Sequence, residues 1–322
     1  MNEEIKIDET ILDMASLLDG SLRGGGKVTD THLKMLRENI EVDDTKTTVH
    51  CYRLPIDGNG RVRFKPLAEF LRVRIIDYAI PRKRIEDARR SLNDTGSTAL
   101  LLKLEKEAKS LFTSLSKSGE GGELLIFAFA EAVFGLNQII CKMSLKTSAE
   151  MHYHGADGVY AKGTDAGGLN VYWGESKLYG DPSDAARDCL KSLAPFLVDT
   201  DGSDSARSQD VFLINEFANF DDPKLAEGLK RYFDLDDTKS LSLKHCGIAL
   251  IGFDTTSYKN DSLNTDEAAL ENELLDQIPT WLKQIKHRVS EEAISQYDIH
   301  FICVPMRTVK EFRDYFLSLL AN

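Results

Sequence analysis

Two short apolar runs near the C-terminal end do most to limit how this chain can fold. Residues 246–254 read CGIALIGFD and residues 297–305 read YDIHFICVP, and both are apolar along nearly their whole length. Strands that are apolar on both faces belong to sheets that helices cover on both sides. The stretches at about 265–288 and 308–320 have a helical period. The sequence therefore predicts an α/β fold with a mixed β-sheet flanked by helices.

The middle of the chain predicts a regular run of elements. Residues 121–134 are apolar for most of three helical turns, which indicates a largely buried helix. Asp181 and Pro182 form an N-cap and first-turn pair that opens another helix, through about residue 193. Between these helices lie three strand candidates, at 138–147, 156–161 and 169–177. The predicted order is helix, strand, strand, strand, helix.

The N-terminal region is expected to be mainly helical. It contains a strand at 47–54, which IDGNGRVRF continues through a DG or NG turn as a hairpin. Pro81 and the NDTGS cluster separate its helical segments. These helical segments are 67–80, 82–92 and 97–115. Farther along, 223–233 is helical in pattern and 209–220 is ambiguous. We expect two domains, residues 1–117 and residues 118–322, the second ending in an acidic α/β extension.

Charge is distributed unevenly along the chain, whose net charge is −12. Residues 51–110 contain 14 Lys or Arg and 8 Asp or Glu, a net charge of +6, whereas residues 201–300 contain 10 and 20, a net charge of −10. A basic segment beside an acidic one is compatible with DNA or partner docking by the first. Ordinary surface charge on both segments explains the counts equally well.

The cysteines and the lengths of the apolar segments indicate the cellular compartment of the protein. The five cysteines lie far apart and form no CxxC pair, so neither a disulfide framework nor a cysteine zinc site is indicated. The first residues are acidic, and no stretch reaches the roughly 18 apolar residues of a membrane span. We expect a cytoplasmic protein that binds no membrane.

A Glu-x-Lys pattern, Glu175-Ser176-Lys177, ends the strand candidate at 169–177. Side chains two apart on a strand share one face, so its carboxylate and ammonium groups project side by side. The same spacing occurs at Glu107 and Lys109, but there the surrounding pattern is helical. Strand context therefore distinguishes Glu175 and Lys177 from other charged pairs.

Asp157 begins the preceding strand candidate, and the turn region KGTDAGGLN separates it from Glu175. If the two strands pair around Ala166, Asp157 falls directly opposite Glu175, and opposite side chains share a face about 5 Å apart. Two carboxylates at that distance repel each other unless a cation lies between them. Their oxygens suit Mg²⁺, or Mn²⁺ in its place, and Lys177 would orient the attacking water or offset developing charge.

These residues together resemble the core of the PD-(D/E)xK nucleases, the αβββα(β) arrangement of restriction endonucleases. The resemblance covers about residues 119–195, although Ala156 stands where the family name has proline. It implies that Asp157 and Glu175 bind the metal with help from the backbone carbonyl of Ser176. It also implies that Lys177 is the catalytic lysine.

The same resemblance assigns a role to the helix that precedes the strands. Glu123 would be a further catalytic acid that completes the metal or water site. Glu120 is the alternative, because the segment GEGGE offers both carboxylates.

More narrowly, GEGGELL, HGADGVYA and YWGESKLYGD with an acidic α/β tail resemble the HamA family, the nuclease subunits of Hachiman antiphage defence systems. The resemblance implies a helicase partner, HamB, that holds the nuclease until damaged or invading DNA is sensed. It implies DNA as the substrate and no small-molecule cofactor.

Eight further residues are candidates for contacts with DNA. Two lie four residues apart on the helix after the Glu-x-Lys pattern, so both can face one DNA backbone. Four lie in PRKRIEDARR, at the spacing of a helix that tracks phosphates. Solvated helix faces and pairing with Glu86 and Asp87 explain these charges equally well. The candidates are His154, Tyr179, Arg187, Lys191, Arg82, Lys83, Arg89 and Arg90.

Other interpretations remain open. His152 and His154 precede Asp157 as HxHxxD, a pattern that lacks the second Asp and third His of HxHxDH metallohydrolases. A nuclease-like scaffold without activity would be expected to lose Asp157, Glu175 or Lys177, and all three are present. A stand-alone restriction-type endonuclease, or a cross-strand salt bridge in an unrelated α/β protein, also accounts for the Glu-x-Lys pattern.

Overall fold

The computed structural model describes residues 10–23, 27–114, 120–145, 155–198, 205–258 and 266–321. Its strands are β1 (Lys34–Glu41), β2 (Thr47–Arg53), β3 (Asn137–Gln138), β4 (Gly158–Gly163), β5 (Leu169–Tyr179), β6 (Leu243–Asp254) and β7 (Ile299–Met306). Its α-helices are α1 (Thr10–Gly20), α2 (Lys65–Val73), α3 (Ile75–Ala79), α4 (Arg82–Thr95), α5 (Ala99–Ser114), α6 (Glu120–Ala132), α7 (Pro182–Leu197), α8 (Ala206–Phe217), α9 (Pro223–Phe233), α10 (Glu267–Glu291) and α11 (Val309–Ala321). Two 3₁₀ turns, η1 (Lys142–Leu145) and η2 (Thr238–Ser242), complete the described elements.

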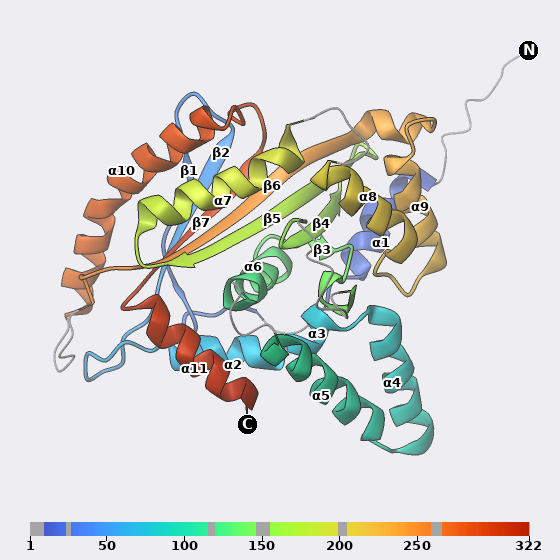
Figure 1. Ribbon diagram of the computed structural model, residues 1–322, viewed down its shortest axis with the longest axis horizontal. Helices are drawn as coiled ribbons and strands as arrows, with labels where there is room; N and C mark the ends of the chain where they lie inside the picture. The colour runs from blue at the N-terminus through green and yellow to red at the C-terminus, as the bar shows by residue number, and fades with distance from the viewer. Residues whose placement is uncertain are drawn as a thin grey trace, which may run out of the picture.

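The seven strands form one mixed sheet in the order β1-β2-β7-β6-β5-β4-β3 (Figure 1). Its central strands β2, β7, β6 and β5 run parallel, and the pairs at each end are antiparallel. Helices flank the sheet, so the predicted α/β class with a mixed, helix-flanked sheet is confirmed. The two apolar runs are the adjacent strands β6 and β7 at its centre.

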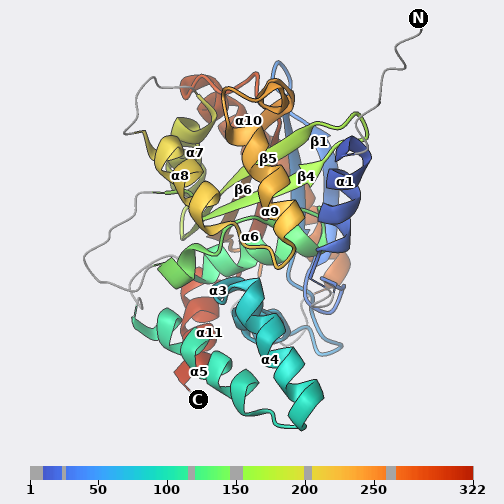
Figure 2. The ribbon, with the colours of Figure 1, turned by 90° about the vertical axis from the view of Figure 1, so that its right-hand side faces the viewer.

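Helices cover both faces of this sheet. On one face α7 packs on β5 and β6, and α10 packs on α7; α6 packs on β5 and β6 from the other face, as Figures 1 and 2 show. The residues of β5 alternate between these layers, because Trp173 stacks on Phe196 of α7 whereas Ser176 lies against Gly122 of α6. Odd-numbered β5 residues therefore face α7 and even-numbered ones face α6.

The predicted order of helix, strand, strand, strand, helix is present as α6, β3, β4, β5 and α7. The first of these strands is much shorter than expected. Residues 138–147 were expected to be extended, but β3 ends at Gln138 and residues 142–145 form η1. The chain leaves the sheet edge there because the ammonium group of Lys142 turns inward to a buried carboxylate and a backbone carbonyl. The ambiguous segment 209–220 is mostly helix, within α8.

The hairpin expected across IDGNGRVRF is present only as the single bridge Ile56–Val62, and β2 pairs instead with β1. No sequence pattern indicated β1, which is an edge strand rich in charged residues. Its pairing with β2 contains register shifts, and Asn39 has a positive φ of 54°. These irregularities break the apolar alternation that marks a strand. With β2, it places part of the N-terminal region in the central sheet, while α2, α3 and α5 contact α11 or α6 and α4 packs on α5. The domain boundary at residue 117 stays a prediction.

None of the helices in the described ranges is both long and apolar enough to cross a bilayer.

Candidate active site

Asp157 stands just before β4, opposite the C-terminal part of β5. The pairs Gly158–Gly174 and Val159–Trp173 give the hairpin the register predicted around Ala166, and the Asp157 amide donates to the Gly174 carbonyl at 2.9 Å. That register is confirmed. Ser176, the middle residue of the Glu-x-Lys pattern, anchors the Asp157 carboxylate. Oδ2 of Asp157 accepts hydrogen bonds of 2.8 Å from both the amide and the hydroxyl of Ser176.

Glu175 and Lys177 form an ion pair on the α7 face of β5. Lys177 Nζ lies 3.2 Å from Glu175 Oε2, and the two side chains are 21% and 5% exposed. Burial, followed by repulsion from Asp157, raises the pKa of Glu175 to about 8, and the attraction of Lys177 opposes this rise only in part. Burial lowers the pKa of Lys177, but the charges of Glu175 and Asp157 outweigh it and the net shift is upward. The ammonium group therefore stays charged between two acids.

Glu123 approaches from the opposite layer, on α6. Its carboxylate is buried, and Oε2 accepts a 2.7 Å bond from the Tyr78 hydroxyl. The preceding Gly122 permits this approach, because a Cβ there would lie 2.9 Å from Ser176 Oγ. The alternative acid, Glu120, begins the same helix, but its side chain lies outside the described residues.

A second buried ion pair supports the chain just before Asp157. Lys142 Nζ binds Asp210 Oδ2 of α8 at 2.5 Å and the Ala156 carbonyl at 2.7 Å, and the same Oδ2 accepts the Ala156 amide at 3.1 Å. A Cβ at Gly155 would lie 2.7 Å from both Lys142 and Asp210. The pair thus fixes the backbone that leads into Asp157, and no sequence pattern pointed to it.

These elements surround a cleft of about 990 Å³ at the C-terminal end of β5. It brings together Glu123, Asp157, Ser176 and Lys177, whereas Glu175 does not line it. The cleft wall also includes two basic residues of α11 that the sequence analysis missed, Lys310 and Arg313. The remaining lining residues are Leu178, Tyr179, Gly180, Asp181, Asp184, Asp254 and Val309.

The donor set determines which cofactor the site fits. In the described ranges, no three or more His, Cys, Asp or Glu side chains are grouped as a metal site, so a cage made wholly of side chains is not found there. The register of the hairpin sets Asp157 opposite Glu175 and so supplies two carboxylates; burial is the main cause of the raised pKa of Glu175, and repulsion from Asp157 is the second. This set fits a hard cation such as Mg²⁺, which binds one or two carboxylates and completes its shell with water and phosphate.

The residues predicted to contact DNA are scattered over three places. Tyr179 lines the cleft. On α7, Lys191 is exposed and Arg187 is bound to Asp184 at 2.6 Å and to Asp188 at 2.9 Å. His154, together with its neighbour in the HxHxxD pattern, lies outside the described residues.

The four basic residues of α4 do not line this cleft. Arg89 is paired with Glu86 of its own helix at 2.7 Å, and Arg90 with Asp221 at 3.0 Å. Lys83 is exposed, and Arg82 is turned into the protein. Their predicted contacts with DNA remain untested.

Comparison with known proteins gives one match. The family model HamA matches residues 30–320, a range that includes Glu123, Asp157, Glu175 and Lys177. No curated protein matches the chain.

Proposed function

Because the chain belongs to the HamA family, a component of Hachiman antiphage defence, we propose that it is the metal-dependent nuclease of such a system. Its proposed reaction is hydrolysis of DNA phosphodiester bonds in the cytoplasm. The observation that carries the proposal is the β4–β5 hairpin, which sets Asp157 opposite Glu175 with Lys177 Nζ 3.2 Å from Glu175.

In this proposal Asp157 and Glu175 hold the metal, with the Ser176 carbonyl as a further oxygen ligand. When bound, Mg²⁺ or Mn²⁺ activates water and neutralises charge on the phosphate. The two bonds from Ser176 to Asp157 Oδ2 orient that carboxylate and leave its other oxygen for the ion. Glu175 begins with a raised pKa, so ion binding also involves loss of a proton from this buried acid.

Lys177 lines the cleft and keeps its charge, so we assign it to the phosphate or the attacking water. The opposite wall offers phosphate contacts from α11. Arg313 is fixed there by a 2.9 Å bond to the Leu178 carbonyl, and Lys310 is 84% exposed. A DNA strand lying between Tyr179 and α11 would present its backbone to Lys177.

A helicase partner, HamB, is part of the same proposal. Its support is family membership, together with the excess of basic residues between positions 51 and 110. Because such a partner would hold the nuclease until DNA is sensed, the complex, rather than the isolated chain, is the form to test.

The test is a plasmid cleavage assay of the full chain with its partner helicase, in Mg²⁺ and in EDTA. We expect Mg²⁺-dependent cleavage that Glu175→Ala and Lys177→Ala each abolish. Glu107→Ala and Lys109→Ala are the matched controls, because they carry the same spacing on a helix.

Two outcomes would contradict the proposal. Equal cleavage by the wild type and both β5 variants would show that Glu175 and Lys177 do not form the active site. Equal cleavage in EDTA and in Mg²⁺ would show that the reaction needs no metal.

A further inference from the structure

A buried group of charges lies away from the cleft, between α3, α4 and α6. The Glu131 side chain is 1% exposed, and its carboxylate lies 3.3 Å from Arg74 and 3.5 Å from Arg82. The Arg23 charge also acts on Glu131. Three guanidinium groups thus share one buried carboxylate. The nearby Asp77 offsets only part of the remaining positive charge.

Of the three arginines, Arg23 has the fewest hydrogen-bond partners among the described residues. All three of its side-chain nitrogens are buried, and none has a hydrogen-bond partner in the parts of the chain that the structure describes. Burial, followed by the nearby positive charge of Arg23, lowers the pKa of Arg82 to about 10. Buried cations without partners are costly, so this arrangement favours an anion.

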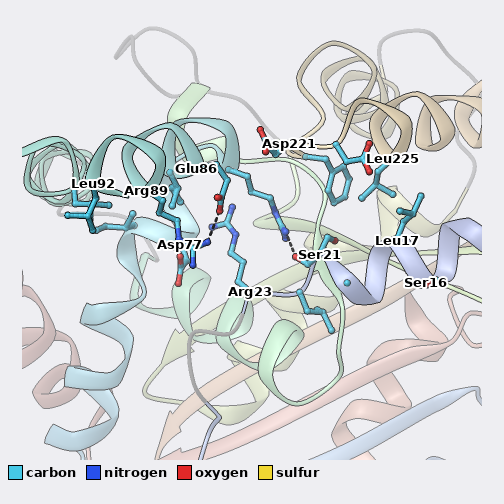
Figure 3. A pocket seen from close by; sticks show the side chains of 18 of the residues that line it. Ser16, Leu17, Ser21, Arg23, Asp77, Glu86, Arg89, Leu92, Asp221 and Leu225 are labelled. Atoms are coloured by element: carbon cyan, nitrogen blue, oxygen red, sulfur yellow. Dashed lines mark hydrogen bonds and ion pairs between the residues drawn. The ribbon is translucent and has the colours of Figure 1, made fainter. Parts of the chain in front are cut away.

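A cavity of about 1040 Å³ opens at Arg23 and Arg82. In Figure 3, the Arg23 side chain extends from the segment after α1 into this space, with Asp77 and Glu86 on one side and Leu225 on the other. Apolar side chains from α1, α3, α4 and α9 form much of the wall. These are Leu17, Ile76, Ile85, Leu92 and Leu225.

The acids that line the cavity already have partners, with one exception. Glu86 is bound to Arg89 at 2.7 Å, and Asp221 to Arg90 at 3.0 Å. Asp222 caps α9 through a 2.8 Å bond from the Lys224 amide. Asp77 is then the carboxylate left to balance the arginines.

We propose that this cavity binds a nucleotide through its phosphate group, at a site separate from the nuclease cleft. Guanidinium groups match phosphate oxygens in geometry and charge. Arg23 offers the phosphate its hydrogen-bond donors, and Arg82, which already donates to the Ser21 carbonyl, adds its positive charge. The Phe220 ring, which already lies 5.4 Å from the Arg82 guanidinium, and the leucine walls suit a base and sugar. The volume is that of a small-molecule site. The cavity and the cleft share no lining residue.

The nucleotide has two possible sources, a free nucleotide or the phosphorylated end of a DNA strand. Calorimetric titrations of the full chain in EDTA compare dAMP, deoxyadenosine, inorganic phosphate and a 5′-phosphorylated oligonucleotide. We expect deoxyadenosine to bind at least tenfold more weakly than dAMP. Tighter binding of dAMP assigns the free nucleotide, and tighter binding of the oligonucleotide assigns the strand end.

Arg23→Met is the decisive variant, because its side chain keeps the length and removes the charge. We expect binding to fall at least tenfold while the melting temperature of the ligand-free chain stays equal or rises. Lys83→Gln is the matched control, because Lys83 is an exposed cation of α4 outside the cavity lining, and this variant should bind like the wild type. Lys177→Ala should also bind normally, which separates this site from the proposed nuclease.

The proposal fails if no phosphate-bearing probe binds, or if Arg23→Met binds them as the wild type does. It also fails if Lys177→Ala abolishes binding, since the probe would then occupy the cleft.

Discussion

Two copies of the Glu-x-Lys pattern, on β5 and on α5, occupy different settings in this molecule. On β5, Lys177 and Glu175 lie 3.2 Å apart and are largely buried. On α5, Glu107 binds Arg84 of α4 at 2.6 Å, and Lys109 pairs with a different carboxylate. Side chains two apart share one face of a strand but diverge on a helix. The same spacing therefore gives one internal pair on β5 and two separate surface contacts on α5.

The largest expected difference between the copies concerns cleavage. Lys177→Ala should reduce the Mg²⁺-dependent cleavage rate by about 10³-fold, the usual cost of losing one group that stabilises a transition state. Lys109→Ala should stay within about twofold of wild type, because Lys109 lies outside the cleft. Initial rates at saturating DNA measure both. A comparable loss in the two variants would mean that overall charge, rather than position, governs the activity.

The Glu-x-Lys pattern on β5 lies beside Asp157, whose preceding backbone is held by the buried Lys142–Asp210 pair, and the pattern on α5 has no such pair beside it in the described residues. Asp210→Asn should lower the free energy of unfolding by about 3 kcal/mol, because it leaves the Lys142 ammonium buried without its counter-ion. Asp184→Asn, which breaks an exposed pair with Arg187, should have a much smaller effect. Urea denaturation distinguishes them. Equal losses would show that the buried pair is not a special support for Asp157.

Neutralising the acids of the two copies should change stability in opposite directions. Glu175→Gln should raise the free energy of unfolding by about 2 kcal/mol at pH 8 without metal, since it removes a buried charge repelled by Asp157. Glu107→Gln should lower it by up to about 1 kcal/mol, since it weakens the exposed pair with Arg84. Stabilisation by both variants, or by neither, would contradict the difference in setting.

Above about pH 4.5, stability should depend on pH through Glu175 and not through Glu107, because the hydrogen bond from Arg84 lowers the pKa of Glu107 and its effect falls at more acidic pH. The folded pKa of Glu175 is about 8 and its ordinary value is 4.5, so the native state holds this proton more tightly than the unfolded state. In EDTA, the wild type should therefore lose stability relative to Glu175→Gln as pH rises from about 4.5 to 8. The slope should be at most about 1.4 kcal/mol per pH unit. A difference in the free energy of unfolding between the two proteins that stays constant over this pH range would contradict the raised pKa of Glu175.

Local pattern was enough to predict the hairpin but not its surroundings. The β4–β5 register followed from one glycine-containing turn and two strands, because both lie within about 20 residues. The Lys142–Asp210 pair joins positions 68 apart, and Arg313 enters the cleft from α11. Neither contact has a local signature. The catalytic roles of Glu123, Asp157, Glu175 and Lys177 remain predictions.

Errors in the predicted elements had the same origin. Residues 138–147 carry a strand pattern, yet tertiary pairing of Lys142 turns the chain into η1. The segment 67–80 was expected to be one helix, but it divides into α2 and α3 at Arg74, whose side chain is drawn into contact with Glu131. In both places a buried ion pair overrode the local preference.

The strand order has a consequence for how the protein is made. Strands β6 and β7 lie at the centre of the sheet but are synthesised after all the others, and β2 pairs with β7 across about 250 residues. On a ribosome, the early hairpins β1–β2 and β4–β5 can form only as separate pieces, because the strands that join them are not yet made. Arg313 completes the cleft wall later still. A chain whose synthesis has not yet reached α11 therefore lacks the full cleft, and the host cell meets the assembled site only after α11 has been made.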